Sequence, residues 1–150
     1  MERERSFFEN CKITFVVLSE WQKRIALSSP ILQNCGISKI ANGVDLIRFS
    51  PKEQLAARKQ LVLPTDKKLI AFGAESVNNP LKGGVVLCKA LKLLEEQLLE
   101  QNPVLITFGN ISETDVLKTG LEVIHMGYLD VEKLSMLYSA LDVTIVPSLE

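Results

Sequence analysis

Lys82 is the residue of this sequence whose type and surroundings point most directly to binding chemistry. It stands before Gly83 and Gly84 at the start of a long helical pattern, and an apolar run at 69–72 leads into the polar loop before it. A strand, a loop and a helix start in this order direct backbone N–H groups and the positive end of a helix dipole at an anion. We therefore predict that the stretch from Phe72 to Gly84 faces phosphate groups.

The charge of Lys82 strengthens this prediction. A cation at a helix start opposes the helix dipole at a cost of about 0.3–1 kcal/mol. A phosphate placed between the lysine and the helix end removes that conflict, because a charge-assisted hydrogen bond contributes about 1.5–3 kcal/mol. The alternative of a solvated lysine stays open from this residue alone.

Glycines follow three of the apolar runs that we interpret as strands. Gly73, Gly109 and Gly127 each come directly after such a run. In open α/β sheets ligands bind beyond the carboxyl ends of the strands, and glycine there allows the backbone to approach a ligand closely. We predict that all three contribute to a binding site, with simple tight turns as the alternative.

Other kinds of site find less support in the sequence. The order Lys82-Gly83-Gly84 is wrong for a P-loop and there is no Gly-x-Gly-x-x-Gly, so a P-loop enzyme or a dehydrogenase is disfavoured. The single histidine, His125, falls in a predicted strand and is interpreted as structural. No Cys/His cluster predicts zinc, and no Asp-x-Asp pair predicts a metal-bridged diphosphate. We expect no metal and no cofactor, and we assign no catalytic residue.

The elements that position these residues alternate regularly along the second half of the chain. Four short apolar runs predict strands at Leu69–Phe72, Val104–Phe108, Glu122–Met126 and Val143–Val146. Leucines at spacings of four, three and four predict a crossover helix from Gly83 to about Glu100. A second helix is predicted from Val131 to about Ala140 with Asp130 as its N-cap, and one helical turn at 112–115. This alternation predicts an α/β fold with a largely parallel sheet.

The first half of the chain is less regular. The run Ile13–Leu18 predicts a buried strand, and Ser19 is predicted to cap a helix from Glu20 to about Ser28. A weak segment at 31–35 and an extended piece at 37–41 lead to Asn42-Gly43, which predicts a tight turn.

A capping box is predicted between the two halves. Ser50 as N-cap, Pro51 at the first helical position and Glu53 at N3 predict a helix that runs to about Leu61. Arg58 and Lys59 are then expected near the C-terminal end of the helix dipole, where a cation is favourable.

Composition excludes several classes of protein. The 150 residues carry a net charge of −1, which gives no footprint for nucleic acid. The three cysteines are odd in number and follow no metal spacing, so we interpret them as reduced and expect a cytoplasmic location. No apolar run has the length of a signal peptide or a membrane span, although contact with a membrane surface stays open.

Taken in order, several motifs resemble those of the family 4 retaining glycosyltransferases, which have the GT-B fold. The matching pieces are Ser19-Glu20-Trp21, Asn42-Gly43-Val44-Asp45 with Phe49 and Pro51, Ala57–Leu61, Phe72-Gly73-Ala74, Pro80–Gly83, Gly127-Tyr128-Leu129, Ala140–Val143 and Val146–Glu150. The resemblance covers most of the chain from residue 12.

The resemblance implies two Rossmann-like domains and a nucleotide-diphosphate sugar as donor. It implies that 1–41 ends the N-terminal domain, 42–66 is the interdomain connection and 67–150 is the first part of the donor domain. Lys82 matches a lysine that contacts the donor diphosphate. The loop Gly127-Tyr128-Leu129 matches the loop near the base, and Ala74 stands where many relatives carry arginine.

The resemblance also implies that the chain is a segment of a longer enzyme. The family continues beyond Glu150 with a Glu-x7-Glu motif, so we expect the isolated chain to show little or no transfer of sugar to its unknown acceptor. The alternatives are a non-catalytic nucleotide-binding module, an inert fragment and, last, an unrelated doubly wound nucleotide protein. Val143, Ile145 and Val146 are expected to be exposed, with low stability or association as the result.

Overall fold

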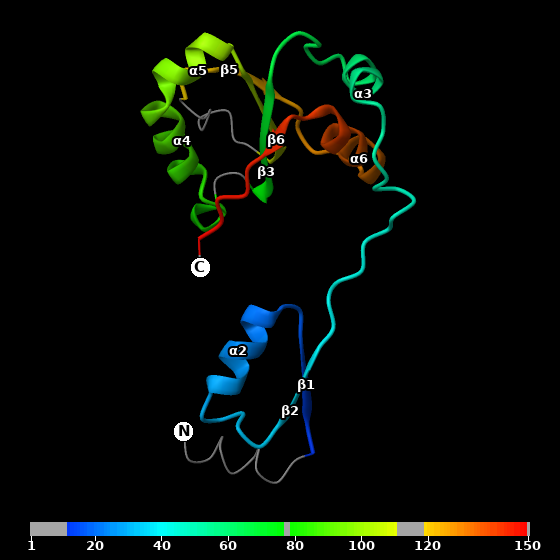
Figure 1. Ribbon diagram of the computed structural model, residues 1–150, viewed down its shortest axis with the longest axis vertical. Coiled ribbons are helices and arrows are strands. Elements are labelled where there is room, and N and C mark those ends of the chain that lie inside the picture. Colours follow the sequence, from blue (N-terminus) through cyan, green and yellow to red (C-terminus); the bar gives the residue numbers. More distant parts are fainter. Residues whose placement is uncertain (1–11, 77–78, 111–118, 150) are drawn as a thin grey trace. The chain divides into compact units, whose positions relative to one another are not determined.

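The computed structural model describes residues 12–76, 79–110 and 119–149 (Figure 1). The chain divides into two units, Met1–Asp45 and Leu46–Glu150. The predicted helical turn at 112–115 lies outside the described residues.

The first unit is a parallel strand pair with one helix. Strands β1, Thr14–Val17, and β2, Gly36–Lys39, pair in register from Thr14 opposite Gly36, and helix α2, Glu20–Ser28, connects them. The Ser19 Oγ accepts the Gln22 N–H at 3.1 Å, which confirms the predicted cap and helix. The Lys39 ammonium lies 2.6 Å from the Glu20 carboxylate and joins β2 to α2.

Two predictions for this unit are wrong. The first strand is not buried, since Val16 is 56% exposed. Two strands and one helix cannot cover both faces of a sheet within the described residues 12–45. The tight turn at Asn42-Gly43 is also absent, because residues 40–45 are irregular and the turn lies at 46–49. Asn-Gly is favoured most strongly in the two-residue turns of antiparallel hairpins, whereas β1 and β2 are parallel.

The second unit is built on a four-stranded parallel sheet in the order β5-β4-β3-β6. The strands are β3, Leu69–Ser76, β4, Val104–Asn110, β5, Glu122–His125, and β6, Val143–Thr144. Helices α3, Gln54–Gln60, and α6, Val131–Ala140, cover one face of the sheet, and α4, Gly84–Leu93, and α5, Glu95–Gln101, cover the other (Figure 1). The predicted α/β fold with a parallel sheet is confirmed.

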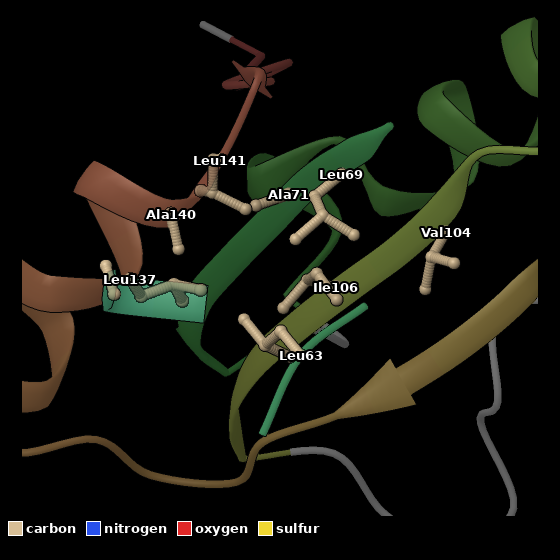
Figure 2. Close-up of a cluster of buried hydrophobic side chains, with 9 residues drawn as sticks. Leu63, Leu69, Ala71, Val104, Ile106, Leu137, Ala140 and Leu141 are labelled. Carbon is tan, nitrogen blue, oxygen red and sulfur yellow. The ribbon is translucent and has the colours of Figure 1, made fainter. Parts of the chain in front are cut away.

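Alternating residues of the central strands build a core on each face of this sheet. Leu69 and Ala71 of β3 face α3 and α6, whereas Phe72 faces α4. The first core cluster, most of which Figure 2 shows, comprises Ala57, Leu63, Leu69, Ala71, Val104, Ile106, Leu137, Ala140 and Leu141. The second comprises Phe72, Leu87, Leu91 and Leu105. Burial on both faces explains why these strands are continuous apolar runs.

The boundaries of three elements differ from the prediction. Strands β3 and β4 continue through Gly73 and Gly109, so these glycines lie within strands rather than after them. The predicted crossover helix is instead two helices, with a break at Leu94. Leu94 was expected in the buried apolar stripe, but it is 45% exposed. Its N–H is shared among the carbonyls of the preceding turn, an arrangement typical of a helix end.

The capping box is also wrong. Helix α3 begins at Gln54, and the carboxylate of Glu53 accepts the N–H groups of Leu55 and Ala56 at 2.8 and 2.5 Å. Ser50 instead donates its hydroxyl to the Ile47 carbonyl at 3.0 Å. An ionised carboxylate binds helix N–H groups more strongly than a hydroxyl does, and it takes the cap position here.

Helix α6 agrees with the prediction at both ends, with the Asp130 carboxylate accepting the Lys133 N–H at 2.8 Å. Strand β6 is shorter than predicted, although the Ile145 N–H still donates to the Ala71 carbonyl at 2.8 Å. Val143 and Val146 are 50% and 79% exposed, as expected. The same expectation is wrong for Ile145, which is partly buried because it packs against the second core cluster.

Candidate functional site

Four of the predicted site residues meet at the carboxyl edge of the sheet. Gly73 and Ala74 belong to β3, Gly109 belongs to β4, and Gly127 follows β5. The β3–β4 register shifts between Gly73 and Ser76, so β3 carries one extra residue where these glycines lie.

Packing between strands explains two of these glycines. A Cβ on Gly73 would lie 2.4 Å from the Phe108 ring, and a Cβ on Gly109 would lie 1.7 Å from the Ala74 carbonyl oxygen. Gly109 also has a φ of +106°, a conformation that side chains disfavour. Contacts within the protein therefore account for glycine at both positions.

Gly127 is different, because a Cβ there would have no atom of the described residues within 4 Å. Its φ of +64° favours glycine, so the backbone conformation alone explains the residue type. Its carbonyl accepts the Gly109 N–H at 2.8 Å. The next two residues point to opposite sides, since Tyr128 is 78% exposed and Leu129 packs against the first core cluster. Gly127 and Tyr128 thus offer an open surface, and Leu129 a core contact.

Lys82 ends the short 3₁₀ helix η1, Pro80–Lys82, which lies between β3 and α4. The Asn79 side chain begins this turn by accepting the Leu81 N–H at 3.0 Å, and Gly83 closes it with a φ of +72°. The Lys82 side chain is exposed. Within residues 12–76, 79–110 and 119–149, its ammonium makes no hydrogen bond or ion pair in the structure. Lys82 is therefore available to an anion.

The opposite, amino edge of the sheet holds a polar network that the sequence did not predict. Arg58 is 5% exposed, and its guanidinium donates to the Ala140 carbonyl at 2.8 Å, the Lys67 carbonyl at 2.9 Å and the Asp142 carboxylate at 2.7 Å. Asp142 also accepts the Leu69 N–H at 2.8 Å and the Lys68 ammonium at 3.1 Å. Arg58 and Asp142 fall in two of the matching motifs, Ala57–Leu61 and Ala140–Val143, but nothing in the sequence paired them.

This network shifts the titration of Asp142. Desolvation opposes ionisation of its carboxyl, but hydrogen bonds from Leu69, Lys68 and Arg58 together outweigh that effect and hold its pKa below the usual value. A cleft of about 560 Å³ lies beside it, lined by Gln54, Arg58, Thr65, Asp66, Lys67, Lys68, Gln101 and Asp142. Because Arg58, Lys67 and Lys68 already have carboxylate partners, this edge has the character of a structural clamp.

Three aromatic rings link the segment before α3 to the carboxyl edge. Tyr138 of α6 lies 6.4 Å from Phe108 in an edge-on arrangement and 6.4 Å from Phe49 in a tilted one. A cleft of about 320 Å³ opens beside Phe49 and Tyr138.

Lys52 fastens the same segment to α6. Its ammonium donates to the Ser135 hydroxyl at 2.8 Å, and its N–H donates to the Ser139 hydroxyl at 3.2 Å. The segment before α3 is thus a fixed part of the second unit.

His125 lies in β5, where it was expected. Its Nδ1 is 3.1 Å from the hydroxyl of Thr107, which is almost fully buried. No acidic side chain of the described residues hydrogen-bonds the ring, so the arrangement of an oriented catalytic base is not present there.

The described part of the chain contains no group of three or more metal-ligating side chains. It also contains no helix with both the length and the apolar character that crossing a membrane requires. Cys35 and Cys88 are free thiols.

Solved structures of other proteins share the fold of this chain. No family model matches the chain, and neither does any curated protein. Among solved structures it resembles a sucrose-phosphate synthase from Thermosynechococcus elongatus, with a TM-score of 0.70 and 25% identity over 97% of this chain and 37% of that one. It also resembles a glycosyltransferase from Rickettsia africae ESF-5, with a TM-score of 0.73 and 18% identity over 100% of this chain and 42% of that one.

The chain therefore spans about two fifths of the length of these two structures. Both neighbours are glycosyltransferases, and the parallel sheets with flanking helices are those of their Rossmann-like units. The chain thus has the α/β, Rossmann-like fold of the GT-B glycosyltransferases.

Proposed function

We propose that this chain is the donor-binding segment of a family 4 retaining glycosyltransferase, which transfers a sugar from a nucleotide-diphosphate donor to an acceptor. The observation that carries the proposal is the likeness to sucrose-phosphate synthase over 97% of the chain at a TM-score of 0.70. The ordered set of sequence motifs supports the same assignment. By this proposal residues 1–41 end the N-terminal domain, 42–66 connect the domains and 67–150 begin the donor domain.

In this proposal the Lys82 ammonium and the N–H groups at the start of α4 bind the donor diphosphate. Lys82 is exposed, and its ammonium forms no ion pair with any described residue. As the sugar–phosphate bond breaks, negative charge grows on the departing diphosphate, and a lysine next to a positive helix end stabilises that charge. The reaction needs no metal for this step.

Gly127 and Tyr128 provide the surface for the nucleotide base. The space beside Gly127 is open, and the Tyr128 ring is 78% exposed, so it can stack on a planar base. Gly73, Ala74, Gly109 and Leu129 are proposed to line the same donor site, and their packing within the protein fixes the shape of its edge.

Calorimetric titration of the chain with UDP and GDP tests the proposal. We expect one of the two to bind and Lys82→Ala to weaken binding about 10- to 100-fold, the equivalent of about 1.5–3 kcal/mol for a lost charge-assisted hydrogen bond. Lys89→Ala is the matched control, since Lys89 is an exposed lysine within α4. Equal effects of the two variants would contradict the role of Lys82.

A second measurement, an assay of sugar transfer by the purified chain, is read together with the titration to separate a chain that binds nucleotide from an inert fragment. Binding without detectable transfer by the purified chain agrees with a donor-binding segment or a non-catalytic nucleotide-binding module. Absence of binding to either nucleotide would leave an inert fragment and overturn the proposal. We also propose a cytoplasmic location and no nucleic-acid partner, on the basis of the free thiols of Cys35 and Cys88 and the net charge of −1.

A further inference from the structure

The residues on both sides of Lys82 contact one distant segment of the chain. A Cβ on Gly83 would lie 1.9 Å from the Pro147 carbonyl oxygen, so the two backbones touch there. The Leu149 N–H donates to the Leu81 carbonyl at 2.8 Å. Lys82 therefore stands between two backbone contacts with the segment Pro147–Leu149.

This segment is itself fixed to the sheet. After β6, the Ile145 N–H donates to the Ala71 carbonyl of β3 at 2.8 Å, and Ile145 packs against the second core cluster. Pro147 has one free backbone dihedral fewer than other residues, which stiffens the path from Ile145 to Leu149. The contacts thus connect the turn that carries Lys82 to the rigid centre of the sheet.

The turn has few other supports. It is a single 3₁₀ turn, held internally by the Lys82 N–H on the Asn79 carbonyl at 2.9 Å and the Gly83 N–H on the Pro80 carbonyl at 3.1 Å. Such a short turn is marginal on its own. Leu81 is 58% exposed, so its side chain adds little anchoring.

We propose that the segment Pro147–Leu149 is a positioning element for Lys82, which holds its ammonium where the diphosphate binds. The inference rests on the proposed function for the role of Lys82. It assigns to 147–149 an effect on nucleotide affinity that acts through the turn and requires no contact with the nucleotide.

Leu149→Pro tests the proposal, because proline removes the N–H that bonds to Leu81. Leu149→Ala is the matched control, since it keeps that N–H and truncates a side chain that is 51% exposed. In hydrogen exchange we expect the Lys82 and Gly83 amides to exchange about tenfold faster in Leu149→Pro than in Leu149→Ala. We expect UDP or GDP affinity to fall about tenfold with it.

A double-mutant cycle separates positioning from general damage to the fold. In a Lys82→Ala background, Leu149→Pro is expected to change nucleotide affinity less than about twofold, because its effect passes through the missing ammonium. Gly83→Ala disturbs the same contact from the side of the turn, because its Cβ would meet the Pro147 carbonyl. Like Leu149→Pro, it is expected to lower nucleotide affinity. It therefore serves as a second variant in case Leu149→Pro misfolds.

Two results would overturn the proposal. One is equal amide exchange at 82 and 83 in Leu149→Pro and Leu149→Ala, and the other is full additivity of Leu149→Pro with Lys82→Ala. The exchange measurement needs no nucleotide. If the chain binds neither UDP nor GDP, the proposed function fails, and exchange alone decides whether 147–149 holds the turn.

Discussion

The two edges of the four-stranded sheet carry similar side chains and use them in opposite ways. At the amino edge, Arg58, Lys67 and Lys68 each bind a carboxylate, and Arg58 is almost fully buried. At the carboxyl edge, Lys82 is exposed and its ammonium has no partner among the described residues. The difference shows that the place of a cation in the fold, and not its type, decides whether it is paired within the protein or left free, as at Lys82, for the anion that we propose.

The largest effect is expected from breaking the amino edge. Arg58→Ala leaves the Ala140 and Lys67 carbonyls without their donor and Asp142 without its buried partner. We expect the free energy of unfolding to fall by about 3–5 kcal/mol, measured by urea denaturation. The neighbouring Lys59 is exposed, so Lys59→Ala is the control and should stay close to wild type. Similar losses in both variants would contradict a clamp at this edge.

The glycines of the carboxyl edge provide the next comparison. Gly109→Ala places a Cβ against the Ala74 carbonyl at a φ of +106°, and we expect it to cost about 2–4 kcal/mol from strain and overpacking. Gly127→Ala meets open space at a φ of +64°, and only the conformational cost of about 1–2 kcal/mol applies. Thermal unfolding of the two variants gives the ranking, and the reverse order would refute the packing argument.

The pH dependence of stability sharpens the role of Asp142. Because its folded-state pKa is lowered, ionised Asp142 stabilises the fold above the unfolded value of 3.8, and this contribution is lost as the pH falls below it. We expect Asp142→Asn to be less stable than wild type by about 1.5–3 kcal/mol at pH 7. The difference in the free energy of unfolding between the two proteins should narrow steadily from pH 5 toward pH 2. A gap independent of pH would show that ionisation of Asp142 does not matter.

The smallest effect on stability is expected at the exposed residues of the carboxyl edge. Lys82→Ala and Tyr128→Ala remove side chains that support no described hydrogen bond within the protein. Their free energies of unfolding should stay within about 0.5 kcal/mol of wild type. Equilibrium denaturation alongside the Arg58→Ala variant tests this contrast. A loss comparable to that of Arg58→Ala would show that both edges serve the fold.

The sequence predicted the elements of the second unit well because its signals there are local. Apolar runs give the strands, and the stripe with Leu87 and Leu91 gives the helix that covers one face. Asp130 caps α6 as predicted, since a cap depends only on its next three residues. The rest of the sheet follows from the order of these elements.

Features that depend on distant partners could not be predicted from the sequence. The interpretation of Gly73 and Gly109 as places for a ligand stays a prediction, and the structure adds that a Cβ on them would meet Phe108 and the Ala74 carbonyl. Arg58 was expected only to favour a helix end, and its partner Asp142 lies 84 positions away. No local pattern reports such pairings, because they exist only once the sheet has formed.

The candidate site was predictable only in part. The sequence placed Lys82 at a helix start, and the structure adds that it sits on a 3₁₀ turn held by residues near position 149. Tyr128 and Leu129 are adjacent in the sequence and differ in exposure, a distinction that motif comparison cannot make.

The pairing of β3 with β6 has a consequence for how this unit folds. β3 meets β4 after one crossover, but its other neighbour begins at Val143, and the Leu69–Asp142 bond that starts this pairing closes a separation of 73 positions. Closing so long a loop costs entropy before any contact compensates for it. We therefore expect one edge of the apolar strand β3 to pair later than the other, and an unpaired apolar strand edge favours aggregation.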